Sequence, residues 1–154
     1  MLFSLGVWGS MDPMSKVLNA SPLFHERIAG PMNSVREYWK LKDTDFQNES
    51  LWNWYTLRAE PELVAKALEK RERVYLVLIN TPQEVVIAGE PSACKELIEE
   101  LKCESHEIPV TDVVHCPPVQ SEYEEIKKVH TNKVVDKPKV DFFSAADYTT
   151  TNLD

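Results

Sequence analysis

The residue best placed to do chemistry in this sequence is His115. It follows Val113 and Val114 at the end of an apolar run, and Cys116 and two prolines after it force the chain to turn. Imidazole titrates near neutral pH, so a histidine at a strand end before a rigid turn can act as a general base. The alternative is a partly buried histidine that only hydrogen-bonds to the backbone. The residue pattern leaves both interpretations open.

A second candidate is a dyad in which the Cys116 thiol is the nucleophile and His115 the base. Adjacent side chains on an extended chain point to opposite sides, so these two residues are poorly placed to pair. The sequence also lacks Gly-x-Ser-x-Gly, which places a serine nucleophile on a strand-to-helix turn, and it lacks a P-loop and His-Glu-x-x-His. The printed residues therefore offer a base without a nucleophile.

Composition excludes several classes of function. The 154 residues include 17 Lys and Arg against 25 Asp and Glu, a formal net charge of -8, which disfavours non-specific binding of nucleic acid. Cys94, Cys103 and Cys116 are an odd number without a Cys-x-x-Cys pair, which disfavours a disulfide framework and a structural zinc site. No apolar run is long enough to span a membrane. We therefore expect a cytoplasmic protein.

The chain opens with the apolar run of residues 1–8. No Lys or Arg precedes Lys16, and Gly6 and Gly9 interrupt the run early, so it does not have the pattern of a secretory signal. We expect this run to be a buried helix or strand whose upstream partner is absent.

The central segment predicts the element order β-α-β-β-α-β. Two amphipathic helices begin at the Glu-Pro pairs of Pro61 and Pro91, because proline suits the first position of a helix. The order over residues 51–110 is that of a ferredoxin-like sheet, with four antiparallel strands and both helices on one face. The expected strands are residues 51–59, 73–80, 84–90 and 104–110.

Shorter elements are expected on either side of this segment. Residues 15–39 predict two short helices that break near Ser21 and again near Gly30. Residues 111–119 predict a short strand that runs into the Pro-Pro turn, and residues 121–130 predict a short helix. One more strand is expected within residues 139–148.

Three stretches carry a resemblance to a known family. They are "RVYLVLINTPQEVVIAGEPSACKELIEEL", "VVHCPPVQSEY" and "VDFFSAADY", in which Asn80-Thr81-Pro82-Gln83, Gly89 and His115 occur in order. The sequence thereby resembles the second half of the malonyl/acyl-CoA:acyl-carrier-protein acyltransferase domain of polyunsaturated fatty acid synthases and polyketide synthases.

The resemblance implies an α+β architecture in three parts. Residues 1–50 are then a helical fragment of a large α/β-hydrolase-like subdomain, and residues 51–110 a ferredoxin-like small subdomain. Residues 111–154 return to the large subdomain with the turn of the catalytic histidine and a disordered tail.

The resemblance also implies transfer of an acyl or malonyl group from CoA to an acyl carrier protein by a Ser-His mechanism. His115 is then the base, its other ring nitrogen being held by a backbone carbonyl or a polar side chain. Arg27 and Asn80 are the substrate-binding residues, with Arg36 as the rival of Arg27. No cofactor or metal is expected beyond acyl-CoA and the phosphopantetheine of the carrier, and the partners are the carrier and the remainder of the synthase.

The nucleophilic serine of the resembled domain falls a few residues before Met1. The chain is then a fragment that is inactive alone. The alternative is a free-standing ferredoxin-like module for interaction or small-ligand binding, and a Gly-x-Ser-x-Gly upstream in the same reading frame distinguishes the two.

Overall fold

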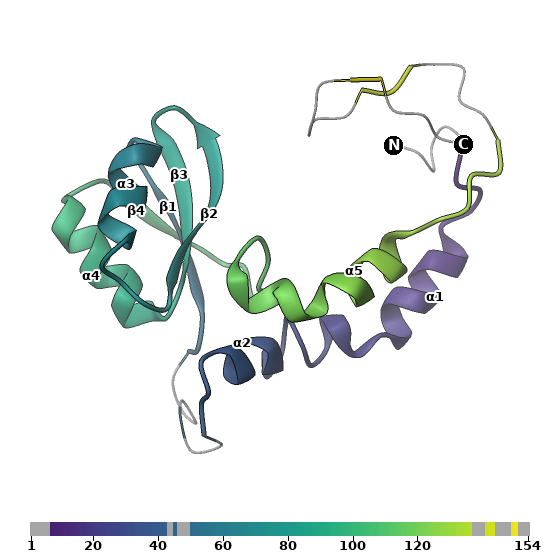
Figure 1. Cartoon of the computed structure of the whole chain (residues 1–154), viewed down its shortest axis with the longest axis horizontal. Coiled ribbons are helices and arrows are strands. Elements are labelled where there is room, and N and C mark those ends of the chain that lie inside the picture. The colour runs from purple at the N-terminus through teal and green to yellow at the C-terminus, as the bar shows by residue number, and fades with distance from the viewer. Residues whose placement is uncertain (1–6, 43–44, 46–49, 137–140, 144–148, 151–154) are drawn as a thin grey trace. The chain divides into compact units, whose positions relative to one another are not determined.

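The computed structural model describes residues 7–42, 45, 50–136, 141–143 and 149–150, and Figure 1 labels its elements. The chain divides into two compact units, Leu23–Tyr123 and the pair of segments Met1–Pro22 and Glu124–Asp154. The predictions for residues 1–6, for most of 139–148 and for the tail from 151 lie outside the described residues.

The larger unit is built on a four-stranded antiparallel sheet. Its strand order is β2-β3-β1-β4, so the first strand in sequence lies inside the sheet, paired with the third and the fourth. The predicted order β-α-β-β-α-β is therefore confirmed (Figure 1). The strands are β1 (Asn53–Leu57), β2 (Val74–Thr81), β3 (Glu84–Gly89) and β4 (Ser105–Ile108).

Two helices, α3 (Pro61–Leu68) and α4 (Pro91–Leu101), cover one face of the sheet and contact each other (Figure 1). Each begins with the predicted proline. Alternate residues of the strands point into the core beneath them, and each fully buried leucine or isoleucine stabilises the fold by about 1.5–3 kcal/mol. The buried members of this core are Tyr55, Leu57, Ala59, Val64, Val74, Val85, Ile87, Cys94 and Leu97.

Aromatic side chains cover part of the opposite face of the sheet. Trp52 stacks between Trp39 and Tyr75, with ring centroids 5.8 Å apart in both pairs. The Trp39 indole N–H donates to the Tyr75 hydroxyl at 2.9 Å, and the Trp54 indole N–H donates to the Asp112 carbonyl at 2.8 Å. The segment that precedes the sheet in sequence and the segment that follows it are thereby both attached to this face.

The segments before and after the sheet contain short helices. These are η1 (Pro22–Phe24) and α2 (Asn33–Tyr38) before it, and η2 (Pro117–Glu122) after it. The prediction of a strand within residues 111–119 is wrong, since none of these residues is in a strand. Strand β4 ends at Ile108, which pairs with Trp54 near the start of β1. The Val113 N–H donates instead to the Ile28 carbonyl at 2.8 Å, so this segment follows a loop rather than a neighbouring strand.

The smaller unit contains α1 (Asp12–Ala20), and α5 (Tyr123–His130) lies in it apart from its first residue. The helix predicted near residues 121–130 is thus present, and the predicted break near Ser21 follows α1. Ser21 is buried, and its hydroxyl donates to the Glu125 carboxylate at 3.2 Å. The Val135 N–H donates to the Val7 carbonyl at 2.8 Å.

Gly89 ends β3, just before α4, at a point where the backbone leaves no room for a side chain. Its φ is +155°, and a Cβ built there would lie 2.7 Å from the Val74 Cα and would overlap the Arg73 carbonyl oxygen. That oxygen accepts the Glu90 N–H at 2.8 Å, so it cannot move without loss of a hydrogen bond. We expect Gly89→Ala to lower the free energy of unfolding by about 1–3 kcal/mol, measured by thermal and urea denaturation. Ser92→Ala, at an exposed position three residues on, is the control and should change it by less than about 0.5 kcal/mol.

Candidate functional site

His115 lies in the loop between β4 and η2, in an unusual backbone conformation. Its φ is +56°, in the left-handed region that few non-glycine residues adopt. Pro117 and Pro118 begin η2 immediately afterwards. Val113, two residues before His115, is fully buried and bonded through its N–H to Ile28. The turn at His115 therefore lies between two fixed points of the backbone.

The side chain of His115 is exposed to solvent. Within the described part of the chain, no hydrogen bond or ion pair engages its ring. The expected hydrogen bond from a second ring nitrogen to a carbonyl or polar side chain is thus absent from these residues. The structural alternative, a partly buried histidine bonded to the backbone, does not describe this residue either.

Arg27 is held between two carboxylates. Its Nη1 and Nη2 donate to the two oxygens of Glu37 at 2.6 and 2.7 Å, and its Nε and Nη2 donate to one oxygen of Glu122 at 2.9 and 2.6 Å. Glu37 is 63% exposed, whereas Glu122 is buried at 9% exposure of its side chain. These hydrogen bonds raise the pKa of Arg27 above its usual value, and the bonds from Arg27 lower the pKa of Glu37. A substrate carboxylate would have to displace Glu37 to reach this guanidinium.

The other two candidate binding residues make local contacts. Arg36 donates through Nε to the Pro31 carbonyl at 2.9 Å and through Nη1 to the Asp45 carbonyl at 3.3 Å. Asn80 lies near the end of β2, exposed, and its amide donates to the Glu84 carboxylate across the hairpin at 2.9 Å. These side-chain hydrogen bonds of Arg36 and Asn80 go to residues outside the loop of His115. Arg27 instead binds Glu122 in η2, the helix that follows this loop.

The thiol beside His115 is unsuited to nucleophilic attack. Burial raises the pKa of Cys116 to about 12, and it raises the pKa of Cys94 to about 12 as well. At pH 7 to 8 the nucleophilic thiolate is then a fraction on the order of 10⁻⁴ or less at either residue. This agrees with the rejection of a Cys-His dyad from the sequence.

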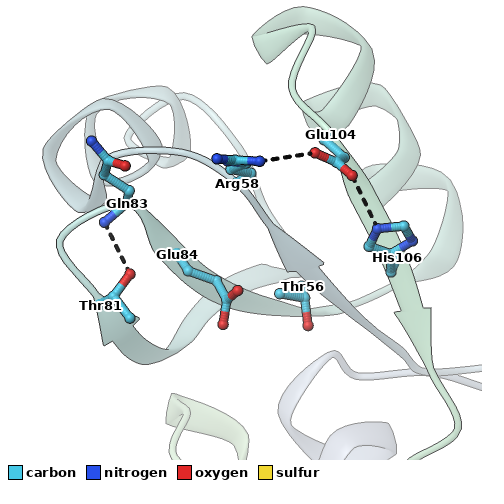
Figure 2. A pocket seen from close by; sticks show the side chains of 7 residues that line it. All are labelled: Thr56, Arg58, Thr81, Gln83, Glu84, Glu104 and His106. Carbon is cyan, nitrogen blue, oxygen red and sulfur yellow. Dashed lines mark hydrogen bonds and ion pairs between the residues drawn. The ribbon is translucent and has the colours of Figure 1, made fainter.

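An open pocket of about 320 Å³ lies on the sheet face that α3 and α4 leave uncovered (Figure 2). Glu104 contacts Arg58 at 3.6 Å and His106 at 3.4 Å, and the Gln83 N–H donates to the Thr81 hydroxyl at 3.2 Å. The pocket is thus bordered by the Asn-Thr-Pro-Gln hairpin, by β1 and by β4. Its walls carry polar side chains, positively charged and negatively charged ones among them. Its lining residues are Thr56, Arg58, Thr81, Gln83, Glu84, Glu104 and His106.

Sequence reasoning missed Glu37 and Glu122. Both lie in polar stretches, and their positions 10 and 95 residues from Arg27 give no periodic signal. Among the described residues, no group of three His, Cys, Asp or Glu side chains is placed to hold a metal ion. No helix in the described ranges is long and apolar enough to cross a membrane.

Comparison with known sequences finds a relative that is much longer than this chain. No family model matches the chain. A stretch of 134 residues, 84% of the chain, is 30% identical to a polyunsaturated fatty acid synthase polypeptide of Thraustochytrium sp. (strain ATCC 26185 / S-3). The match spans only 6% of that protein, so the chain corresponds to a small part of it.

Comparison with solved structures agrees with this match. The acyltransferase domain from module 8 of the salinomycin polyketide synthase superposes with a TM-score of 0.53 and 22% identity, over 66% of this chain and 25% of that one. The malonyl CoA-acyl carrier protein transacylase from Clostridium perfringens gives 0.52 and 24%, over 71% and 37%. The resemblance inferred from the motifs is thereby confirmed: the chain is similar in sequence to a short part of a polyunsaturated fatty acid synthase and has the fold of part of an acyltransferase domain.

Proposed function

We propose that this chain forms part of an acyltransferase that moves an acyl group from CoA to an acyl carrier protein, with His115 as the general base. The observation that supports this role best is the exposed imidazole on a left-handed turn between two fixed points of the backbone. Strained backbone at an exposed titratable side chain is typical of functional sites. The similarity to a fatty acid synthase and to acyltransferase domains supports the kind of reaction.

In the proposed reaction, the His115 imidazole accepts the proton of a serine hydroxyl as its oxygen attacks the thioester carbonyl of acyl-CoA. The carbon–sulfur bond then breaks, and the CoA thiolate takes the proton from the imidazolium and leaves. In the second half, the imidazole accepts the proton of the carrier's phosphopantetheine thiol as that sulfur attacks the acyl-serine ester. The bond between the acyl carbon and the serine oxygen then breaks, and the imidazolium returns the proton to that oxygen as it leaves.

The nucleophile of this proposal is a serine outside the printed sequence. The sequence contains no Gly-x-Ser-x-Gly, and desolvation raises the pKa of all three cysteine thiols, which keeps them mostly protonated at neutral pH. The chain then supplies the base, and the remainder of the synthase supplies the nucleophile. This chain alone is inactive under the proposal.

The proposal assigns the three parts of the chain as the resemblance implies. Residues 51–110 are a ferredoxin-like small subdomain, which the strand order β2-β3-β1-β4 supports. Residues 1–50 and 111–154 then belong to a large α/β-hydrolase-like subdomain. Asn80 is proposed to contact the substrate from the hairpin, and Arg27 can do so only through exchange of Glu37 for a substrate carboxylate.

The alternative function is a free-standing module that binds a small ligand or a protein. The pocket of about 320 Å³ on the uncovered face of the sheet is the observation that favours it (Figure 2). Sequencing the DNA upstream of Met1 separates the two functions. A Gly-x-Ser-x-Gly in the same reading frame supports the acyltransferase, and its absence supports the module.

The first test asks whether the chain carries its own nucleophile. Incubation of the purified chain with radiolabelled acyl-CoA at about pH 7.5 should leave no stable label on the protein, because Cys94 and Cys116 are almost fully protonated. Label is measured after denaturing electrophoresis. Cys116→Ser should give the same blank, and a stable label that this substitution removes would show that Cys116 is a nucleophile after all.

The second test concerns His115 in a polypeptide that joins this chain to its serine. His115→Asn should lower the rate of acyl transfer by about 10²–10⁴-fold, since it removes the base. Asparagine adopts a positive φ more readily than other non-glycine residues, so the unfolding midpoint should stay within about 2 °C of the wild type. His106→Asn, which alters an exposed histidine elsewhere, is the control and should retain the rate. A wild-type rate per folded molecule in His115→Asn would rule out the catalytic assignment.

A further inference from the structure

Two consecutive residues, Arg27 and Ile28, contact the chain on both sides of His115. The Ile28 carbonyl accepts the Val113 N–H at 2.8 Å, two residues before the histidine. The Arg27 guanidinium binds the carboxylate of Glu122 at the end of η2, seven residues after it. The loop of His115 is therefore attached at both ends to a single point of the chain.

That point is itself rigid. The Arg27 carbonyl accepts both the hydroxyl of Ser34 at 2.7 Å and its backbone N–H at 3.1 Å. The Ile28 N–H donates to the Leu23 carbonyl at 2.9 Å, and Ile28 and Ser34 are 2% and 1% exposed. Buried groups with all these bonds made do not move without leaving polar atoms unpaired, which costs about 1–3 kcal/mol for each.

The two carboxylates on Arg27 differ in what they hold. Glu37 belongs to α2, is largely exposed, and lies on the same segment of chain as Arg27 itself. Glu122 is buried and belongs to the segment that carries His115. An exposed ion pair contributes about 1 kcal/mol or less, whereas a buried carboxylate that loses its partner destabilises its surroundings strongly.

We propose that Arg27 is a positioning residue for His115 and acts through Glu122, rather than a ligand of a substrate carboxylate. The guanidinium fixes η2 against residues 27 and 28, and the His115 turn is confined between that contact and Val113. The catalytic consequence rests on the proposed function of His115. The restraint on the loop does not, and it can be measured in the chain alone.

The experiment compares Glu122→Gln with Glu37→Gln in the full chain. Both replace one carboxylate on the same guanidinium with an amide, but only the first weakens the contact to the loop of His115. The readouts are the NMR signal of the His115 ring carbon Cε1 and its proton, and the hydrogen-exchange rate of the Val113 amide. Glu122→Gln should shift or broaden the ring signal and raise the exchange rate by about tenfold or more, and Glu37→Gln should leave both near the wild type.

Arg27→Lys guards against a variant that fails to fold, because it keeps a cation beside the buried Glu122 while losing the paired hydrogen bonds. Its effects on both readouts should lie between the wild type and Glu122→Gln. Equal effects of Glu37→Gln and Glu122→Gln, or an unchanged ring signal in both Glu122→Gln and Arg27→Lys, would overturn the positioning role.

Acyl transfer by the polypeptide that includes the serine separates this inference from the proposed function. Glu122→Gln should lower kcat for neutral and carboxylated acyl groups alike and leave KM nearly unchanged. If Arg27→Gln instead slows the transfer of carboxylated acyl groups only, and does so mainly by raising KM, Arg27 is a substrate ligand. If the wild-type polypeptide transfers no acyl group, the proposed function fails, and the NMR comparison still decides whether Arg27 positions the loop.

Discussion

The buried carboxylate of Glu122 is the constraint on which the arrangement around His115 depends. With its side chain 9% exposed it has lost most of its hydration, and such a charge is tolerated only with a well-placed cationic partner. Arg27 is that partner, at 2.6 Å. The Arg27 carbonyl also accepts from Ser34, and the Ile28 carbonyl accepts from Val113, so the contacts of these two consecutive residues join three separate segments.

The choice of arginine follows from the number of bonds required. The guanidinium donates two hydrogen bonds to Glu122 and two to Glu37, which a lysine ammonium on a flexible stem cannot do in one plane. The three groups together carry more negative than positive charge, so a third carboxylate is repelled unless Glu37 withdraws. Four hydrogen bonds thus engage the guanidinium within the fold, and the residue type alone does not reveal these contacts.

The sheet and its helices could be predicted because their signals are local. Helices α3 and α4 begin at Pro61 and Pro91, and each carries an apolar stripe that matches the strands beside it. The loop before η2 could not be predicted, because the two valines before His115 have the composition of a strand. What decides their conformation is the bond from Val113 to Ile28, which is far away in sequence, and no local pattern contains it. The same holds for Glu122, whose partner Arg27 is also distant.

The left-handed conformation of His115 follows from its surroundings. Val113 is bonded to Ile28, and Pro117 begins η2 with a φ restricted by its ring, so the chain must change direction within the few residues between them. A glycine or asparagine would make this turn with less strain than histidine. The ring of His115 is exposed and makes no hydrogen bond or ion pair with the residues that the structure describes. What the side chain adds to the turn is a solvent-accessible imidazole, the kind of group that a general base requires.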